Sequence, residues 1–156
     1  MSAIRSAATK PVTGVINVVS FGFHEGKGAK ANAVDGGRAR ADFLKAKRRD
    51  EIDAVEEWLP LLASRETAGW LITVVTKADL WWSQRDAVLE HYSNGEYAQA
   101  LQEAKELRPV VMEYCSVFHR YFGEAPMDGN FEEADRTRAR GHLMKQLLAA
   151  TGKGAS

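Results

Sequence analysis

The 156-residue chain has very little cysteine and no excess of charge of either sign. Its one cysteine, Cys115, excludes an internal disulfide and is typical of a reducing compartment. The 21 Lys and Arg residues balance the 21 Asp and Glu residues, so no net field favours nucleic acid or an anionic membrane surface. These absences predict a cytoplasmic protein that binds no nucleic acid.

Long apolar runs are also missing. No stretch approaches the roughly 20 apolar residues that a membrane span needs, and residues 1–14 lack the apolar centre of a signal peptide. The four histidines do not have the paired spacing of a zinc site, and no base with an orienting acid accompanies Ser116. We therefore expect no membrane span, no metal site and no catalytic residue in this chain.

Three short apolar runs rich in β-branched residues stand out, at residues 14–20, 70–76 and 109–116. Such runs are typical of strands that are buried on both faces of a parallel sheet. Helical periodicity fills the intervals, and this alternation predicts an α/β fold with a three-layer, mainly parallel sheet and the 70–76 strand in its middle. We expect one domain over 14–151, between a flexible lead-in at 1–13 and a flexible tail at 152–156.

The first predicted helix covers residues 38–64, and Pro60 is expected to kink it or to end it near Leu59. The basic start of this segment is followed at once by acidic residues, which we interpret as one solvated helix face. Asn130 and Glu133 form a capping-box-like pair for the last helix. The other helices are expected at 84–91 and 96–107, on either side of Asn94-Gly95.

In parallel sheets, ligands bind at the carboxyl ends of the strands. This rule selects three loops, at residues 21–28, 76–82 and 116–120. The second loop begins with Thr76-Lys77-Ala78-Asp79, directly after a buried strand.

The Asp79 carboxylate suits recognition of a base edge. When ionised it accepts two parallel hydrogen bonds, and the ring N–H and exocyclic amine of guanine form such a donor pair, whereas adenine has no equivalent pair on that edge. In an extended chain Lys77 and Asp79 point to the same side, so the lysine stem can lie across the base that Asp79 contacts. The alternative is that both residues belong to a solvated turn that leaves a buried strand.

This segment resembles the base-recognition motif of the P-loop GTPase superfamily (TRAFAC-like G domains), usually Asn-Lys-x-Asp, with Thr76 where asparagine is usual. Cys115-Ser116-Val117 resembles the Ser-Ala loop that closes over guanine in that family. The resemblance covers the carboxyl-terminal half of such a domain, over residues 14–150, and implies a partial P-loop NTPase-like domain. It implies guanine-binding roles for five residues, namely Thr76, Lys77, Asp79, Ser116 and Val117.

The resemblance gives each of these residues a task. Asp79 would contact the base edge, Lys77 would pack along the base, and Thr76 would tie neighbouring loops together. Ser116 would help to close the pocket, and the backbone N–H of Val117 would reach the guanine carbonyl.

The phosphate-binding half of that family is missing from the sequence. There is no Gly-x-x-x-x-Gly-Lys-Ser/Thr, and the nearest string, GFHEGKG at 22–28, is one residue short and has Gly28 where a hydroxyl should bind magnesium. We therefore expect binding of GTP or GDP without independent hydrolysis, and no Mg²⁺ held by this chain alone. The strand from Gly14 to Ser20 would then be an unpaired apolar edge, open to a partner protein or to self-association.

Two alternatives accompany this interpretation. The first is an interaction module of the same fold that binds no nucleotide and uses the 14–20 strand. The second is an enzyme that uses loop 21–28 on a small phosphorylated substrate. In all three cases we interpret Trp81 and Trp82 as core or interface anchors and Cys115 as a buried, inert thiol.

Overall fold

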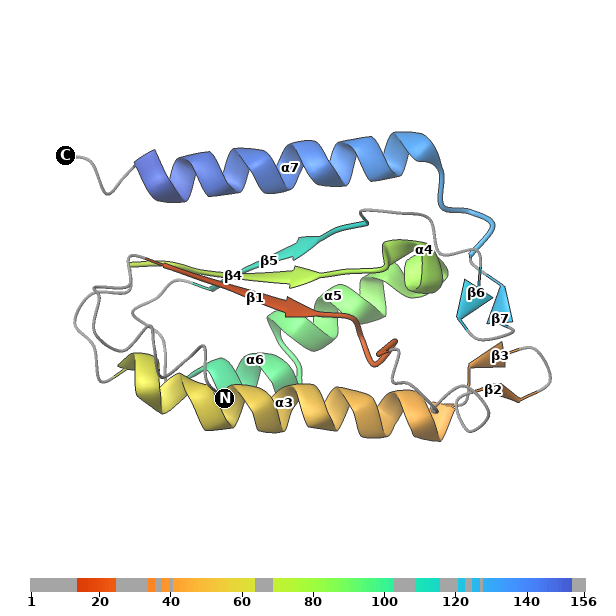
Figure 1. The fold of residues 1–156 in the computed structure, drawn as a ribbon, viewed down its shortest axis with the longest axis horizontal. Coiled ribbons are helices and arrows are strands. Elements are labelled where there is room, and N and C mark those ends of the chain that lie inside the picture. Colours follow the sequence, from red (N-terminus) through yellow and green to blue (C-terminus); the bar gives the residue numbers. More distant parts are fainter. Residues whose placement is uncertain are drawn as a thin grey trace.

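The computed structural model describes residues 14–24, 34–35, 38–39, 41–63, 69–102, 109–115, 121–122, 125–126 and 128–152. The predicted lead-in at 1–13 lies outside these ranges, as do residues 153–156 of the predicted tail. Within them, strands and helices alternate along the chain as the apolar runs predict (Figure 1).

A three-stranded parallel sheet forms the centre of the molecule. Its strands are β1 (Val15–Val19), β4 (Leu71–Val75) and β5 (Pro109–Glu113), in the order β1-β4-β5. The three predicted strands, their parallel direction and the middle position of the second are confirmed. β5 is shorter than predicted and ends at Glu113. The Tyr114 N–H still donates to the Val75 carbonyl, but the Tyr114 carbonyl accepts from Ala78, at the start of the helix that follows β4.

Helices cover both faces of the sheet (Figure 1). One face carries α3 (Ala41–Ala63), α5 (Arg85–Ser93) and α6 (Glu96–Ala100), and α7 (Glu133–Gly152) lies over the other. Between β4 and α5 come the short helix α4 (Ala78–Trp81) and the 3₁₀ turn η2 (Trp82–Gln84). The chain therefore has an α/β architecture in which the sheet lies between two helical layers.

Two small antiparallel pairs lie near the carboxyl ends of the strands (Figure 1). β2 (Val34–Asp35) pairs with β3 (Arg38–Ala39), and β6 (Tyr121–Phe122) pairs with β7 (Ala125–Pro126). Because β3 occupies residues 38–39, α3 begins at Ala41 rather than at the predicted residue 38.

The main core lies between the sheet and the layer of α3, α5 and α6. Alternate β4 residues, Leu71 and Val75, join it, while Ile72 and Val74 point to the opposite face, toward α7. All five residues of β4 are buried because it has a strand on each edge and helices on each face. Trp81 is fully buried and Trp82 packs against the core, as anchors should.

Two predicted helices differ from the structure in their extent. Of the two alternatives at Pro60, an end near Leu59 is wrong, because α3 continues through Pro60 to Ala63. Pro60 is exposed, so water can bond to the helix carbonyl that lacks its N–H partner. The predicted helix at 96–107 is described only as α6, which ends at Ala100, and residues 103–107 lie outside the described ranges.

The start of α7 is held by Glu132 and Asp135 rather than by the predicted pair of Asn130 and Glu133. The Glu132 carbonyl accepts from the N–H groups of Asp135 and Arg136, and the Asp135 carboxylate accepts from the Glu132 N–H at 3.1 Å. Asn130 instead belongs to a turn, in which its N–H donates to the Asp128 carboxylate at 3.0 Å. In the described part of the chain, no helix is long and apolar enough to cross a membrane.

Candidate functional site

The ends of β1, β4 and β5 meet at one edge of the sheet, because the three strands are parallel. Hydrogen bonds join the segments that follow them. Lys77 Nζ donates to the Phe23 carbonyl at 2.5 Å, which links the segment after β4 to the segment after β1. The Ala78 N–H donates to the Tyr114 carbonyl at 3.3 Å, which links it to the end of β5. The described parts of the candidate loops at 21–28 and 76–82 therefore meet each other and the end of β5, whereas the loop at 116–120 lies outside the described residues.

Thr76 ties two of these segments together. Its hydroxyl and its N–H both donate to the Val19 carbonyl, each at 2.8 Å. Its own carbonyl accepts from the indole N–H of Trp81 at 2.8 Å. The side chain thus joins the ends of β1 and β4, and the buried indole fixes the turn that follows.

Lys77 has a left-handed backbone, with φ 60° and ψ 40°. This conformation costs a residue with a side chain about 1–2 kcal/mol. It also corrects our expectation of an extended chain, because the backbone turns at Lys77 and α4 begins at Ala78. Lys77 and Asp79 are therefore not placed by strand alternation, and the lysine side chain reaches across to the Phe23 carbonyl.

Asp79 lies in the first turn of α4 and is fully buried. Its Oδ1 accepts a hydrogen bond from the Cys115 thiol at 3.4 Å. Burial, together with the adjacent Asp79 carboxylate, raises the pKa of the Cys115 thiol to about 12, so the thiol keeps its proton at neutral pH. The thiol therefore contacts one oxygen of the carboxylate that we expected to contact a base.

Of the five predicted guanine-binding residues, the structure brings together Thr76, Lys77 and Asp79. Ser116 and Val117 lie outside the described residues. The contact between Asp79 and Cys115 nevertheless places the residue before Ser116 directly beside the Thr76–Asp79 segment. Of the predicted loop at 21–28, residues 21–24 are described and 25–28 are not.

Sequence reasoning missed Glu51, which lies on α3 in the segment that we interpreted as a solvated face. The residue is only 5% exposed, and its carboxylate holds the segment that follows β1. Oε1 accepts from the backbone N–H groups of Ser20 at 3.0 Å and Gly22 at 3.2 Å, and it lies 2.7 Å from His24 Nε2. Oε2 accepts from the Tyr92 hydroxyl at 2.5 Å.

The pKa of Glu51 reflects two opposing effects. Burial raises it, but the hydrogen bonds from His24, Tyr92, Ser20 and Gly22 together outweigh burial and lower the pKa below its usual value. Glu51 is therefore a carboxylate at neutral pH. A single acidic residue within a charged run gives no sequence signal of this role, because its partners are distant in the chain.

The segment that Glu51 holds has an unusual backbone. Phe21 and Gly22 both have positive φ, 53° and 83°. A Cβ atom at Gly22 would lie 2.4 Å from the Leu44 carbonyl oxygen, so only glycine fits there. The Phe21 N–H donates to the Tyr92 hydroxyl at 2.9 Å, and the Arg48 guanidinium lies 4.5 Å from the centre of the Phe21 ring. Contacts from α3 and α5, on the same face of the sheet, thus fix the end of β1.

Among the described residues, no group of three or more histidine, cysteine or carboxylate side chains could hold a metal ion. No family model, no curated protein and no solved structure matches the chain. We therefore infer function from the residues and contacts themselves.

Proposed function

We propose that this chain is a partial P-loop NTPase-like domain that binds GTP or GDP at the carboxyl edge of its sheet. One observation carries the proposal. The Asp79 carboxylate and the Cys115 thiol are 3.4 Å apart, so Cys115, the first residue of one segment that resembles a guanine-binding motif, lies beside Asp79 of the other such segment. Their place at the carboxyl ends of neighbouring parallel strands is where α/β sheets bind ligands.

In this proposal, Asp79 accepts hydrogen bonds from the ring N–H and exocyclic amine of guanine. The base takes the place of the Cys115 thiol beside Oδ1 of the carboxylate and supplies two N–H donors. Lys77 packs its aliphatic stem along the base, while Thr76 keeps the β1 and β4 ends together. Ser116 and Val117 close the pocket from the β5 side.

The proposed activity is binding without independent hydrolysis, in the cytoplasm. Phosphoryl transfer depends on a phosphate-cradling loop, its lysine, and magnesium held by a hydroxyl and a carboxylate. The sequence has no such motif with the required spacing. Contacts to the base are the same in the ground state and in the transition state, so they do not lower the chemical barrier.

Titration calorimetry with GDP, GTP and ADP tests the proposal. We expect GDP and GTP to bind and ADP to bind at least tenfold more weakly, since adenine lacks the donor pair that Asp79 accepts from. Substitution of Asp79 by asparagine should weaken binding of GDP and GTP. The Asp86→Asn variant changes an exposed aspartate in the same way, so it is the matched control and should bind as the wild type does. Equal affinity for GDP and ADP would overturn base recognition. Binding of none of the three would favour the alternative of an interaction module without a nucleotide.

A further inference from the structure

At the outer edge of β1, the peptide groups of two residues have no strand partner among the described residues. The Val15 N–H donates to the Trp70 carbonyl at 2.9 Å, and the Val19 carbonyl accepts from Thr76 at 2.8 Å, so these residues turn their peptide groups toward β4. Backbone alternation therefore directs the N–H and C=O groups of Ile16 and Val18 away from β4. In the described part of the chain, no strand pairs with that edge.

The side chains at this edge are exposed as well. Ile16 is 49% and Val18 is 61% exposed, although both are large and apolar. They lie on the α7 face of the sheet, opposite to Asn17 and Val19. An apolar strand with free peptide groups is a template for pairing with another chain.

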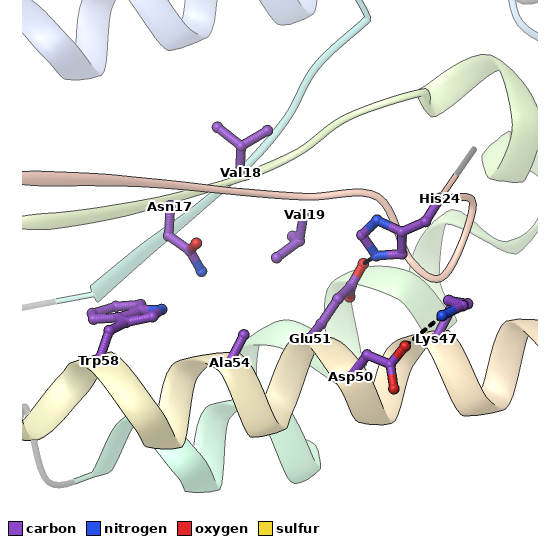
Figure 2. A pocket seen from close by; sticks show the side chains of 9 residues that line it. All are labelled: Asn17, Val18, Val19, His24, Lys47, Asp50, Glu51, Ala54 and Trp58. Atoms are coloured by element: carbon purple, nitrogen blue, oxygen red, sulfur yellow. Dashed lines mark hydrogen bonds and ion pairs between the residues drawn. The ribbon is translucent and has the colours of Figure 1, made fainter. Parts of the chain in front are cut away.

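A cavity of about 360 Å³ lies below the edge, between β1 and α3 (Figure 2). Asn17 and Val19 point into it from the strand, while Ala54 and Trp58 line it from the helix. The charged groups at its other end already have partners. Lys47 Nζ lies 2.6 Å from the Asp50 carboxylate, and the Glu51 carboxylate is held as described above. The polar groups Asn17 and His24 are also engaged, because the Asn17 amide donates to the Tyr97 hydroxyl and His24 bonds to Glu51. The part of the cavity next to Val19, Ala54 and Trp58 is therefore suited to an apolar side chain.

We propose that the open edge of β1 binds an extended segment of another polypeptide, which adds to the sheet as a fourth strand. The residue opposite Asn17 places an apolar side chain in the cavity, next to Trp58. Its two neighbours in the segment lie on the other face, where they cover Ile16 and Val18. Main-chain hydrogen bonds supply affinity, and the cavity supplies selectivity for the central side chain. This site is separate from the proposed guanine site and does not depend on nucleotide binding.

A second copy of this chain fits the edge poorly. α3 runs below β1 and lines the cavity with it (Figures 1 and 2). Pairing β1 with β1 of a second copy sets the two strands about 4.8 Å apart. The two α3 helices would then be brought together on the same face, whereas packed helices need about 8–10 Å between axes. A single extended segment has no helix of its own, so its side chains can pack against α3 without a clash.

The test follows hydrogen exchange of single amides by NMR, with a synthetic peptide as the probe. The peptide is Lys-Thr-Val-Leu-Val-Thr-Lys with blocked ends. Its leucine side chain should enter the cavity, and its two valines should cover Ile16 and Val18. In the free protein, the Ile16 and Val18 amides should exchange much faster than the Asn17 amide, which faces β4. Saturating peptide should slow exchange of the Ile16 and Val18 amides by about tenfold or more.

Two methylated peptides separate strand pairing from simple hydrophobic contact. One carries N-methyl groups on both valine amides, and the other carries them on the leucine amide and the following threonine amide. Only alternate amides of an added strand face β1, so one peptide should lose binding and the other should keep it.

Substitutions in the protein, rather than in the peptide, test the same contacts. Val18→Pro removes an N–H that takes no part in pairing with β4, and it should abolish binding, whereas Val18→Thr keeps the N–H and should retain it. Ala54→Phe fills the cavity and should weaken binding about tenfold or more.

Four results would overturn the proposal. The first is protection of the Ile16 and Val18 amides in the free monomer, which would show that the edge is already covered. The second is equal binding of the two methylated peptides, and the third is no binding of the unmethylated peptide. The fourth is a wild-type dimer in light scattering that Val18→Pro converts to monomers, because a second copy would then occupy the edge. The peptide comparisons use wild-type protein, so they stand even if Val18→Pro does not fold.

Discussion

The side-chain ammonium of Lys77 donates a hydrogen bond to the backbone carbonyl of Phe23, with 2.5 Å between the two atoms. This contact joins the segment after β4 to the segment after β1, although the two residues are 54 positions apart. Glu51 holds the same β1 segment from α3. The candidate site is therefore fixed from two sides before any ligand arrives.

Lys77 should show the energetic signature of a left-handed residue. Lys77→Ala and Lys77→Gly both remove the hydrogen bond to Phe23, but glycine adopts φ 60° without steric cost. We expect Lys77→Gly to be more stable than Lys77→Ala by about 1 kcal/mol. The measurement is the free energy of unfolding in urea.

An exposed lysine inside a helix, beyond its first turn, provides the control for this comparison. At Lys45 of α3 the order should reverse, with glycine about 1 kcal/mol less stable than alanine. If glycine and alanine were equally stable at position 77, the left-handed conformation would be wrong.

Glu51 should make stability depend on pH in a defined direction. Its carboxylate accepts four hydrogen bonds in a buried setting, so Glu51→Gln should cost about 2–3 kcal/mol at neutral pH. Because the folded-state pKa is lowered, this stability is present above the usual value of 4.5 and is lost as the pH falls through the lowered pKa.

The measurement is unfolding of wild type and Glu51→Gln across acidic and neutral pH. The difference between the two proteins should be constant near neutrality and should shrink in acid. The exposed Glu57→Gln variant should show no such convergence. A difference for Glu51 that stays the same down to low pH would contradict the charged, hydrogen-bonded state.

Cys115 should be unreactive in the folded protein. Burial and the Asp79 carboxylate raise the pKa of its thiol to about 12, against 9.0 for the unperturbed group. At pH 8 the thiolate fraction should therefore fall by about a thousandfold on folding. Alkylation by iodoacetamide, with and without denaturant, measures the ratio. Equal rates in both conditions would contradict a buried thiol in contact with Asp79.

The strands were predictable because each is a short apolar run with little competing signal. The 70–76 run becomes a strand with five buried residues, so its lack of polar alternation matches its surroundings. The buried state of Cys115 was predictable for the same reason, since it ends an apolar run, and that of Trp81 was predictable because tryptophan is large and apolar.

Local geometry and distant partners were not predictable from the pattern. A lysine gives no sign that its backbone is left-handed, so the turn at Lys77 was missed. The role of Glu51 depends on Ser20, Gly22 and Tyr92, which only the tertiary fold brings near it. The capping role of Glu132 was missed because Asn130 is the stronger capping residue by type.

The most direct test of guanine recognition is a comparison of GDP with xanthosine diphosphate on the wild type and on Asp79→Asn. An amide offers one acceptor oxygen where guanine needs two, so Asp79→Asn should weaken GDP binding by about 2–3 kcal/mol. The same variant should bind xanthosine diphosphate better than the wild type does, because the amide N–H can donate to the additional carbonyl of xanthine. Titration calorimetry gives all four affinities. Unchanged affinity of Asp79→Asn for GDP would contradict the proposed role of Asp79.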